Sequence, residues 1–206
     1  MHSVGTRGLR GGYRRDRDVT HDGARTRILD AAYDLFSREG INAVGIDRII
    51  AAAPVAKATL YHHFASKEDL VCAFLDLRGK RWTADWLQAE IERRAADGEA
   101  RAVVVFDALD EWINRPDFEG CSFINTLIEI GNRGGPIHTT TVRHLDSIRA
   151  MMEGYAREAG ALNPRDTGFQ LQILMMGAIV SARRGDGQAA RRARALAELL
   201  VHGSEH

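Results

Sequence analysis

Residues 57–64, Lys-Ala-Thr-Leu-Tyr-His-His-Phe, combine cationic, hydroxyl and imidazole side chains with two large apolar positions. Successive residues on a helix are about 100° apart, so Leu60 and Phe64 share one face and His62 points the opposite way. The outward face is short or flat, can form hydrogen bonds and carries no acidic residue. Such a face suits the major groove of DNA, where a helix offers donors to base edges and phosphates. A short surface helix in a bundle would give the same pattern, and these eight residues alone do not exclude it.

Other candidate chemistry is weaker. His62 and His63 are neighbours on a helix and diverge, so they cannot chelate one ion together, and His138 and His144 also face differently. A convergent set of acid, base and nucleophile is missing, as is a glycine-rich phosphate loop. We therefore expect no enzyme, no metal site and no cofactor. Cys72 and Cys121 are more typical of buried packing residues than of redox sensors.

Two helices precede residues 57–64 and would position them. An apolar stripe predicts a helix from Asp22 to Glu39, with Asp22 as its cap and Gly40 at its end. A short helix follows at about 46–52, and then a tight turn at 53–56. This order predicts a helix-turn-helix unit with a supporting first helix, in which three helices share one core. The stripe consists of Ile28, Leu29, Ala32, Leu35 and Phe36.

The rest of the chain also has helical periodicity, and no strand signal interrupts it. A long helix starts after a Ser66 cap and runs to about Ile91, with Gly79 as a weak point within it. Further helices are expected at 99–114, after the 115–120 loop, and at 137–159, 164–184 and 187–202. The fold class is therefore all-α. We divide the chain into a disordered basic arm (1–21), a DNA-binding domain (22–67) and a larger helical domain (68–206).

The bulk properties agree with DNA binding at one end. The 206 residues carry 28 basic and 28 acidic side chains. Residues 1–67 hold 11 Lys and Arg against 7 Asp and Glu, and the remainder is acidic. A basic end on an acidic body fits a protein that holds DNA with that end only. No apolar run could span a bilayer and no signal peptide pattern is present, so we expect a cytoplasmic protein without membrane contact.

With these residues in view, the chain resembles the TetR/AcrR family of transcriptional repressors. The resemblance is carried by Thr26–Phe36, Asp47–Ala53, Lys57, Thr59-Leu60-Tyr61, His63-Phe64 and Ser66-Lys67. It implies a homodimer that binds a palindromic double-stranded DNA operator, with the last two helices (164–184 and 187–202) forming a four-helix interface. A small-molecule effector, of unknown identity, would bind the larger domain and move the long helix. By position, the predicted DNA-contacting residues are Lys57, Ala58, Thr59, Tyr61, His62, His63 and, at a phosphate, Lys67.

Three residues depart from the family pattern. Gly45 and Ala56 stand where the family usually has side-chain caps, and the loss of a cap costs about 1 kcal/mol. Pro54 replaces the usual turn glycine, although proline cannot adopt a positive φ. We therefore expect the turn to be made differently here, with an effect on the stability and pose of the DNA-binding unit.

Aromatic residues of the larger domain suggest a pocket for a small apolar or aromatic effector. For each of them, ordinary core packing is the alternative. A regulator of the same fold without an effector is the second functional hypothesis, and activation rather than repression is also open. The predicted lining consists of Trp82, Trp86, Phe106, Trp112, Phe123, Asn125, Tyr155 and Met175, with Glu129 and His144 as further polar contacts.

Overall fold

The computed structural model describes residues 15–96, 98–131 and 133–202. Its described residues form helices and connecting turns without a β-strand, which confirms the all-α prediction. The elements, in chain order, are α1 (Arg15–Glu39), α2 (Ile46–Ala52), α3 (Lys57–His63), α4 (Lys67–Arg78), the π-helix η1 (Gly79–Leu87), α5 (Gln88–Ala95), α6 (Arg101–Ile113), α7 (Ser122–Glu129), α8 (Pro136–Glu158), α9 (Pro164–Arg183) and α10 (Ala189–His202).

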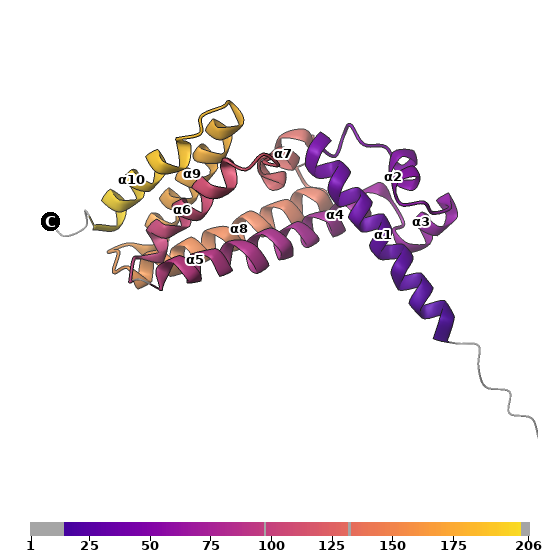
Figure 1. Ribbon diagram of the computed structural model, residues 1–206, viewed down its shortest axis with the longest axis horizontal. Coiled ribbons are helices and arrows are strands. Elements are labelled where there is room, and N and C mark those ends of the chain that lie inside the picture. The colour runs from indigo at the N-terminus through magenta and orange to yellow at the C-terminus, as the bar shows by residue number, and fades with distance from the viewer. Residues whose placement is uncertain (1–14, 97, 132, 203–206) are drawn as a thin grey trace, which may run out of the picture.

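The elements form two parts, which we call the head (α1 to α3) and the body (α4 to α10). Figure 1 shows the head at one end of an elongated molecule and α9 and α10 toward the other. The run from α4 through η1 to α5 lies along α8 and joins the two parts. Because α4 packs against both α1 and α8, this run connects the body to the head.

The head is built around a small apolar core shared by its three helices. Ile28, Ile49 and Leu60 have no exposed surface, and Phe64 is also buried. The backbone N–H of Gly40 donates to Phe36 O at 3.0 Å, and the φ of Gly40 is 86°, so this glycine closes α1 as the sequence predicts. All three helices contribute side chains to this core. Isolated helices as short as α2 and α3 are marginal in water, so they depend on this shared packing.

The turn between α2 and α3 is made without a side-chain cap. Ala56, at the N-cap of α3, and Gly45, at the N-cap of α2, provide no capping hydrogen bond. Ala53 ends α2 at φ −90° and ψ 3°, so the turn does not need the positive φ that Pro54 could not adopt. The first turn of α3 therefore lacks a stabilising acceptor at a position where serine would supply one.

A serine at position 56 should stabilise the head. Ala56 has φ −70° and ψ 148°, the extended conformation of an N-cap residue, so a serine hydroxyl could accept from the exposed N–H groups of α3. We expect Ala56→Ser to raise the free energy of unfolding by about 1 kcal/mol. Urea denaturation followed by circular dichroism measures this change. Ala51→Ser, an exposed position within α2 with no free N–H groups to cap, should not stabilise and serves as the control.

Helix α1 begins earlier than expected. It starts at Arg15, so residues 15–21 are helical and the prediction that the disordered arm reaches residue 21 is wrong for them. The segment 14–22 contains neither glycine nor proline, so a helix nucleated downstream extends through it at low cost. Asp22 consequently lies inside the helix and does not cap its start. Residues 1–14, the rest of the predicted arm, lie outside the described residues.

The long helix departs from regular α-helical geometry at Gly79, the weak point that the sequence predicts. From Gly79 the hydrogen-bonding pattern becomes π-helical and returns to α at Gln88. A Cβ on Gly79 would lie 2.5 Å from the His144 ring, so a glycine is needed for α8 to approach this closely. Segments of π-helix often occur at functional sites. Gly79 thus lets the long helix pack closely against His144 of α8.

The body is held by helices that pack along much of their length. Helix α9 packs against both α8 and α10, and α10 packs against α6. Leu171, Met175 and Ile179 form the buried side of α9, as expected for a helix with apolar residues nearly all round. Cys121 is buried and Cys72 partly buried, both as free thiols, and burial raises the pKa of each. No described helix is long and apolar enough to cross a membrane.

Candidate nucleic-acid interface and small-molecule cavity

Helix α3 presents the face that its sequence predicts. Leu60 is fully buried and Phe64 is 4% exposed, whereas Tyr61 keeps 44% of its surface exposed. Lys57, Ala58 and His62 are exposed as well, and Thr59 and His63 are partly buried. The residues predicted to contact DNA therefore share one accessible surface, with the apolar pair directed into the head. Their contacts with DNA remain predictions.

Lys57 is paired with a carboxylate of the head. Its Nζ lies 3.0 Å from Asp47 Oδ1, an ion pair that joins the start of α3 to the start of α2. The hydrogen bond to Asp47 raises the pKa of Lys57, so the side chain is fully charged at neutral pH. Both groups are exposed, and such pairs are weak. The pair with Asp47 therefore holds Lys57 only weakly, and its contact with a DNA phosphate stays a prediction.

Lys67 lies at the first turn of α4, next to the head. Ser66 caps this helix, since its Oγ accepts from the backbone N–H of Asp69 at 3.0 Å. The predicted Ser66 cap is therefore present. The free backbone N–H groups and dipole of a helix N-terminus favour an anion. Lys67 is the first residue of this helix, close in sequence to α3, where its positive charge could pair with a DNA phosphate.

The head is attached to the body by polar contacts. The backbone N–H of Asn42 donates to Glu129 Oε2 at 2.8 Å, and its side-chain amide donates to Glu129 O at 2.9 Å. Arg38 Nε pairs with Glu119 at 3.3 Å, and Arg81 pairs with Asp30 at 2.8 Å. Glu129, considered as a polar contact in the effector pocket, instead fastens the loop after α1 to the end of α7.

A cavity of about 290 Å³ lies where the head meets the body. This is close to the lower end, about 300 Å³, of small-molecule sites. Its walls come from α1, from the α4–η1 junction, from α6 and from the loop that follows α6. The lining consists of Tyr33, Asp34, Ser37, Arg38, Arg78, Arg81, Trp82, Trp86, Trp112, Arg115, Asp117 and Glu119.

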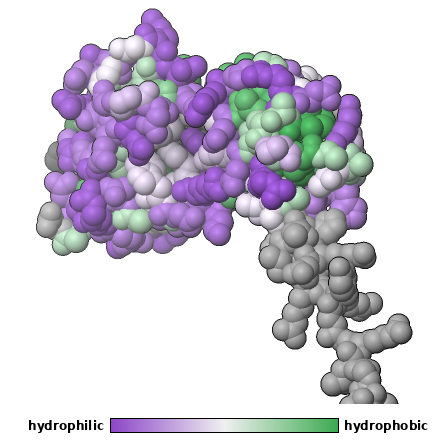
Figure 2. Space-filling view, turned by 45° about the vertical axis from the view of Figure 1, so that its right-hand side comes forward, coloured by the Kyte–Doolittle hydropathy of each residue, from purple (hydrophilic) through white to green (hydrophobic). Residues whose placement is uncertain are grey.

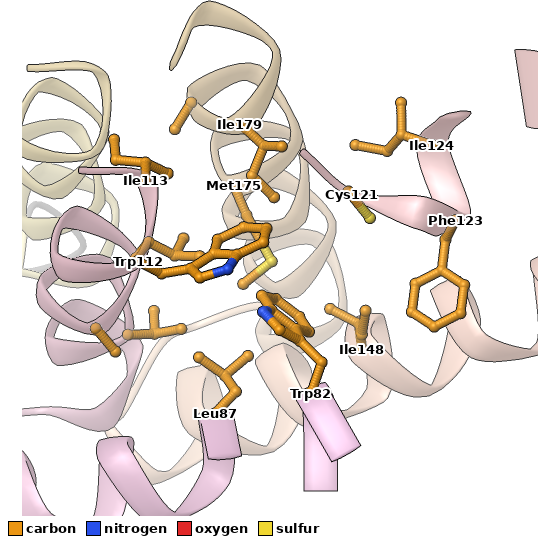
Figure 3. Close-up of a cluster of buried hydrophobic side chains, with 14 of the residues drawn as sticks. Trp82, Leu87, Trp112, Ile113, Cys121, Phe123, Ile124, Ile148, Met175 and Ile179 are labelled. Carbon is orange, nitrogen blue, oxygen red and sulfur yellow. The ribbon is translucent and has the colours of Figure 1, made fainter. Parts of the chain in front are cut away.

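Three of the predicted pocket residues come together at this cavity. The ring centroids of Trp82 and Trp112 are 4.8 Å apart, and those of Trp82 and Trp86 are 5.9 Å apart. Phe118, which the sequence did not single out, meets Trp112 edge-on at 4.8 Å. Figure 3 shows Trp82 and Trp112 next to each other, although they come from separate helices, with Met175 beside them.

The other predicted pocket residues do not line the cavity. Phe106 and Met175 belong to the buried core. Phe123 stacks on His144 with ring centroids 5.0 Å apart, and His144 Nε2 lies 2.8 Å from Asp76 Oδ1, which links α8 to α4. Tyr155 is buried, and this burial raises its pKa. Asn125 is partly buried on α7.

Sequence reasoning missed the arginines of the cavity. Arg78 is four residues before Trp82 and therefore shares its helix face, which is a signal that the sequence did contain. The contributions of Tyr33 and Ser37 from the head could not be read from any spacing, because they come from a helix more than 40 residues away. The cavity is consequently more polar and more cationic than the predicted aromatic pocket.

The surface differs between the two parts. Figure 2 shows an apolar patch on the head, while the body on the same side is mainly polar. The described head has several apolar side chains that are only partly buried, because one helix and two short ones of seven residues each cannot enclose a core completely. They include Leu29, Leu35, Ile46, Ile50 and Val55. Among the described residues, no group of three His, Cys, Asp or Glu side chains is placed to hold a metal ion.

Both parts of the chain match models of known families. The model described as bacterial regulatory proteins, tetR family, matches residues 28–74, which cover most of the head and α4. The model described as tetracyclin repressor-like, C-terminal domain, matches residues 98–197 in the body. The two matches agree with the separation of head and body that the structure shows.

Curated regulators resemble the chain over a limited length. The HTH-type transcriptional regulator QacR of Staphylococcus aureus is 32% identical over 66 residues, which are 32% of this chain and 35% of QacR. The HTH-type transcriptional activator FasR of Mycolicibacterium smegmatis is 42% identical over 65 residues, 32% of this chain and 30% of FasR. The chain therefore aligns with about a third of the length of these relatives.

A solved structure extends the similarity to nearly the whole chain. SCO4454, a TetR-family transcriptional regulator from Streptomyces coelicolor, superimposes with a TM-score of 0.78 at 28% identity. The match covers 90% of this chain and 97% of that one. The arrangement of head and body is thus similar to that of this regulator throughout.

Proposed function

Because the chain belongs to the TetR family of transcriptional regulators, we propose that it represses transcription by binding a palindromic operator as a homodimer. The observation that carries this function is the face of α3. Leu60 and Phe64 fix the helix on the head, while Tyr61 and His62 stay accessible. A helix held this way can lie in a major groove, with Lys57 and Lys67 at flanking phosphates. Under this proposal the protein is a regulator and not an enzyme, and it is located in the cytoplasm, where the DNA is.

The surface of α9 and α10 supports the dimer. Phe169, Ile173 and Val180 follow one another on α9 at helical spacing, and each is at least 41% exposed. Leu196 and Leu199 are exposed by 50% and 70% on the adjacent α10. An apolar stripe over two packed helices is typical of a face that a partner covers. A second copy with the same stripe would complete a four-helix interface.

The position of the cavity supports control by a small apolar or aromatic effector. Tyr33 and Ser37 of the head and Trp82 and Trp112 of the body line the same space. A ligand that contacts both parts shifts their relative position by as much as its affinities for the two arrangements differ. Effector binding would change the separation of the two heads in the dimer, which must match the half-site spacing of the operator.

Substituting Tyr61 tests the assigned orientation of α3. We expect Tyr61→Ala to weaken operator binding by at least about 1 kcal/mol, the cost of one specific contact. Fluorescence anisotropy with DNA from immediately upstream of the protein's gene measures the change, and scrambled DNA serves as the reference. The variant should remain a dimer in sedimentation, because Tyr61 is exposed on the head. An unchanged affinity for the operator would show that α3 faces the DNA differently.

The same assay tests the function itself. Binding that is selective for sequence and falls steeply with salt is expected, since Lys and Arg release counterions from phosphates. If the upstream DNA is bound no better than scrambled DNA, selection from a random DNA pool decides between another operator and a head that does not bind. Failure of the selection to enrich any sequence would contradict the proposed function.

Two alternatives keep the fold and change the regulation. One is a regulator controlled by abundance or by a protein partner, which would show no release of the operator by small molecules. The other is an activator, and FasR carries that name among the relatives of this chain. A reporter gene under the bound promoter separates the two directions, because deletion of a repressor raises its expression and deletion of an activator lowers it.

A further inference from the structure

We infer that the cavity between the head and the body takes a small aromatic carboxylate, and that its occupation releases the operator. This inference rests on the proposed function and specifies its effector site. Three features carry it: flat indole walls, a partly buried arginine without a carboxylate partner, and two buried hydrogen-bond donors that the protein leaves unsatisfied. Each feature is contributed by residues that line the same cavity of about 290 Å³.

The aromatic part of the ligand is indicated by the walls. Trp82, Trp86 and Trp112 all line the cavity, and the ring centroids of Trp86 and Trp112 are 6.4 Å apart. Separations of this size are those of aromatic rings in mutual contact, so the indoles form one continuous wall. Trp86, which is partly buried, keeps surface on which a further ring can pack in stacked or edge-on geometry. The chain contains three tryptophans in total, so all of its indoles are gathered at this one place.

The negative charge of the ligand is indicated by Arg78. Three other arginines of the lining each have a carboxylate partner: Arg38 with Glu119, Arg81 with Asp30, and Arg115 with Asp117. Arg78 instead donates to the Tyr33 hydroxyl at 2.9 Å and lies over the Tyr33 ring, 5.7 Å from its centroid. No carboxylate pairs with it among the described residues.

The remaining acid of the lining does not cancel this charge. Asp34 is exposed to solvent on α1, whereas Arg78 is partly buried. Water and salt screen an exposed carboxylate strongly, and a partly buried cation much less. A guanidinium in this position can bind a carboxylate through two parallel N–H groups, the geometry in which arginine recognises planar anions.

Two buried donors belong to residues of the cavity lining. Ser37 Oγ and Trp82 Nε1 have no hydrogen-bond partner among the described residues, although both side chains belong to residues that are 7% exposed. Leaving such groups unsatisfied costs free energy, and buried polar groups are normally paired. Both residues line the cavity. Each of the two atoms has less than 1 Å² of accessible surface, so a carboxylate bound to Arg78 reaches these donors only when their side chains shift toward it.

The location explains how occupation reaches the DNA. Ser37 and Tyr33 lie on α1 of the head, whereas Arg78 and Trp82 lie on the run that crosses from α4 into η1. A carboxylate that binds Ser37 and Arg78 together connects the head to the long helix. The arrangement of the head that closes on the ligand is then favoured over others, including the one that fits the operator.

The test compares acids with neutral molecules of the same shape. Benzoate, phenylacetate and 3-phenylpropionate are titrated by calorimetry into the full-length protein, each beside its primary amide. Quenching of tryptophan fluorescence reports occupation of the cavity directly, because every tryptophan of the chain lines it. We expect at least one acid to bind about tenfold or more tightly than its amide, as hydrogen bonds to a charged group require. The same acid should lower operator affinity in the anisotropy assay.

Variants locate the site. Arg78→Gln should abolish the preference for acid over amide, and Ser37→Ala should weaken acid binding by about fivefold, the value of one hydrogen bond. Ser37→Ala removes a hydroxyl that has no partner among the described residues, so it should leave the fold intact even if Arg78→Gln does not. Arg93→Gln, which removes an arginine of α5 that pairs with Glu90 away from the cavity, is the matched control and should change nothing.

Four results would overturn the inference. The first two are that no acid binds, or that acids and their amides bind equally well. The third is that Arg93→Gln loses the preference for acid over amide as much as Arg78→Gln does. The fourth is that an acid binds but leaves operator affinity unchanged. If operator binding is intact, each of these results contradicts the proposed effector site but not the proposed DNA-binding function. Failure of the protein to bind any DNA selectively overturns the proposed function instead, and the calorimetry still measures the acid preference independently.

Discussion

Replacing Ile173 with glutamate is expected to dissociate the proposed dimer and reduce operator affinity by about 100-fold or more. Ile173 is 65% exposed in the middle of the apolar stripe on α9. In a dimer it would be buried, and a carboxylate there would lose its hydration without a partner. Two heads joined in one dimer bind two half-sites with an effective-concentration advantage of about 10² to 10⁴, which a monomer loses. Sedimentation velocity and operator anisotropy measure the two effects on the same sample.

A second isoleucine on the surface provides the control. Ile128 is 78% exposed on α7 and is not part of the stripe on α9 and α10. Ile128→Glu makes the same chemical change and should leave both mass and operator affinity unaltered. If Ile173→Glu remains a dimer with full affinity, the dimer forms through another surface. If both variants dissociate, the effect is not specific to the stripe on α9 and α10.

Adding a single methyl group at Gly168 should destabilise the body by about 2 kcal/mol. A Cβ at this position would lie 2.8 Å from Glu153 Cα and from Glu153 N, so it meets the backbone of α8 and not a side chain that could move away. Overpacking of this kind costs about 3 kcal/mol, and the better helix propensity of alanine returns about 1 kcal/mol. Urea denaturation of Gly168→Ala at fixed protein concentration measures the difference.

The opposite sign is expected at a glycine of the facing helix. No atom lies within 4 Å of a Cβ built on Gly154, which is also inside a long helix. Gly154→Ala should therefore stabilise the protein by up to about 1 kcal/mol through helix propensity alone. Equal effects of the two substitutions would show that α8 and α9 do not approach as closely as the structure indicates.

The amino-acid sequence contains much of the fold because helices are encoded locally. The stripe from Ile28 to Phe36 predicts α1, Gly40 predicts its end, and Ser66 predicts the cap of α4, as the structure confirms. The pair Leu60 and Phe64 sets the buried face of α3 and hence its accessible face. Each of these features depends on residues within about two helical turns of one another, and such spacings are visible in one sequence.

The start of α1 and the π-helical segment of the long helix could not be predicted from the sequence pattern. Residues 15–21 are polar apart from Val19 and lack an apolar stripe, so periodicity gave no reason to extend the helix through them. The π-helical segment depends on how η1 lies against its neighbours, where His144 leaves no space for a side chain at Gly79. Contacts of this kind join α4 and α8, which are separated by more than 50 residues in the chain.

By itself, the sequence determined the helices, the surface of α3 that can face DNA, and the family to which the chain is similar. Tertiary structure decided which of the aromatic residues surround a cavity, and which polar residues join them. Trp82, Trp86 and Trp112 meet Ser37 and Arg78 because the head is fastened against the body by Asn42 and Glu129. Helical periodicity specifies a face but not its partner, and the partners here are brought together only when the helices pack.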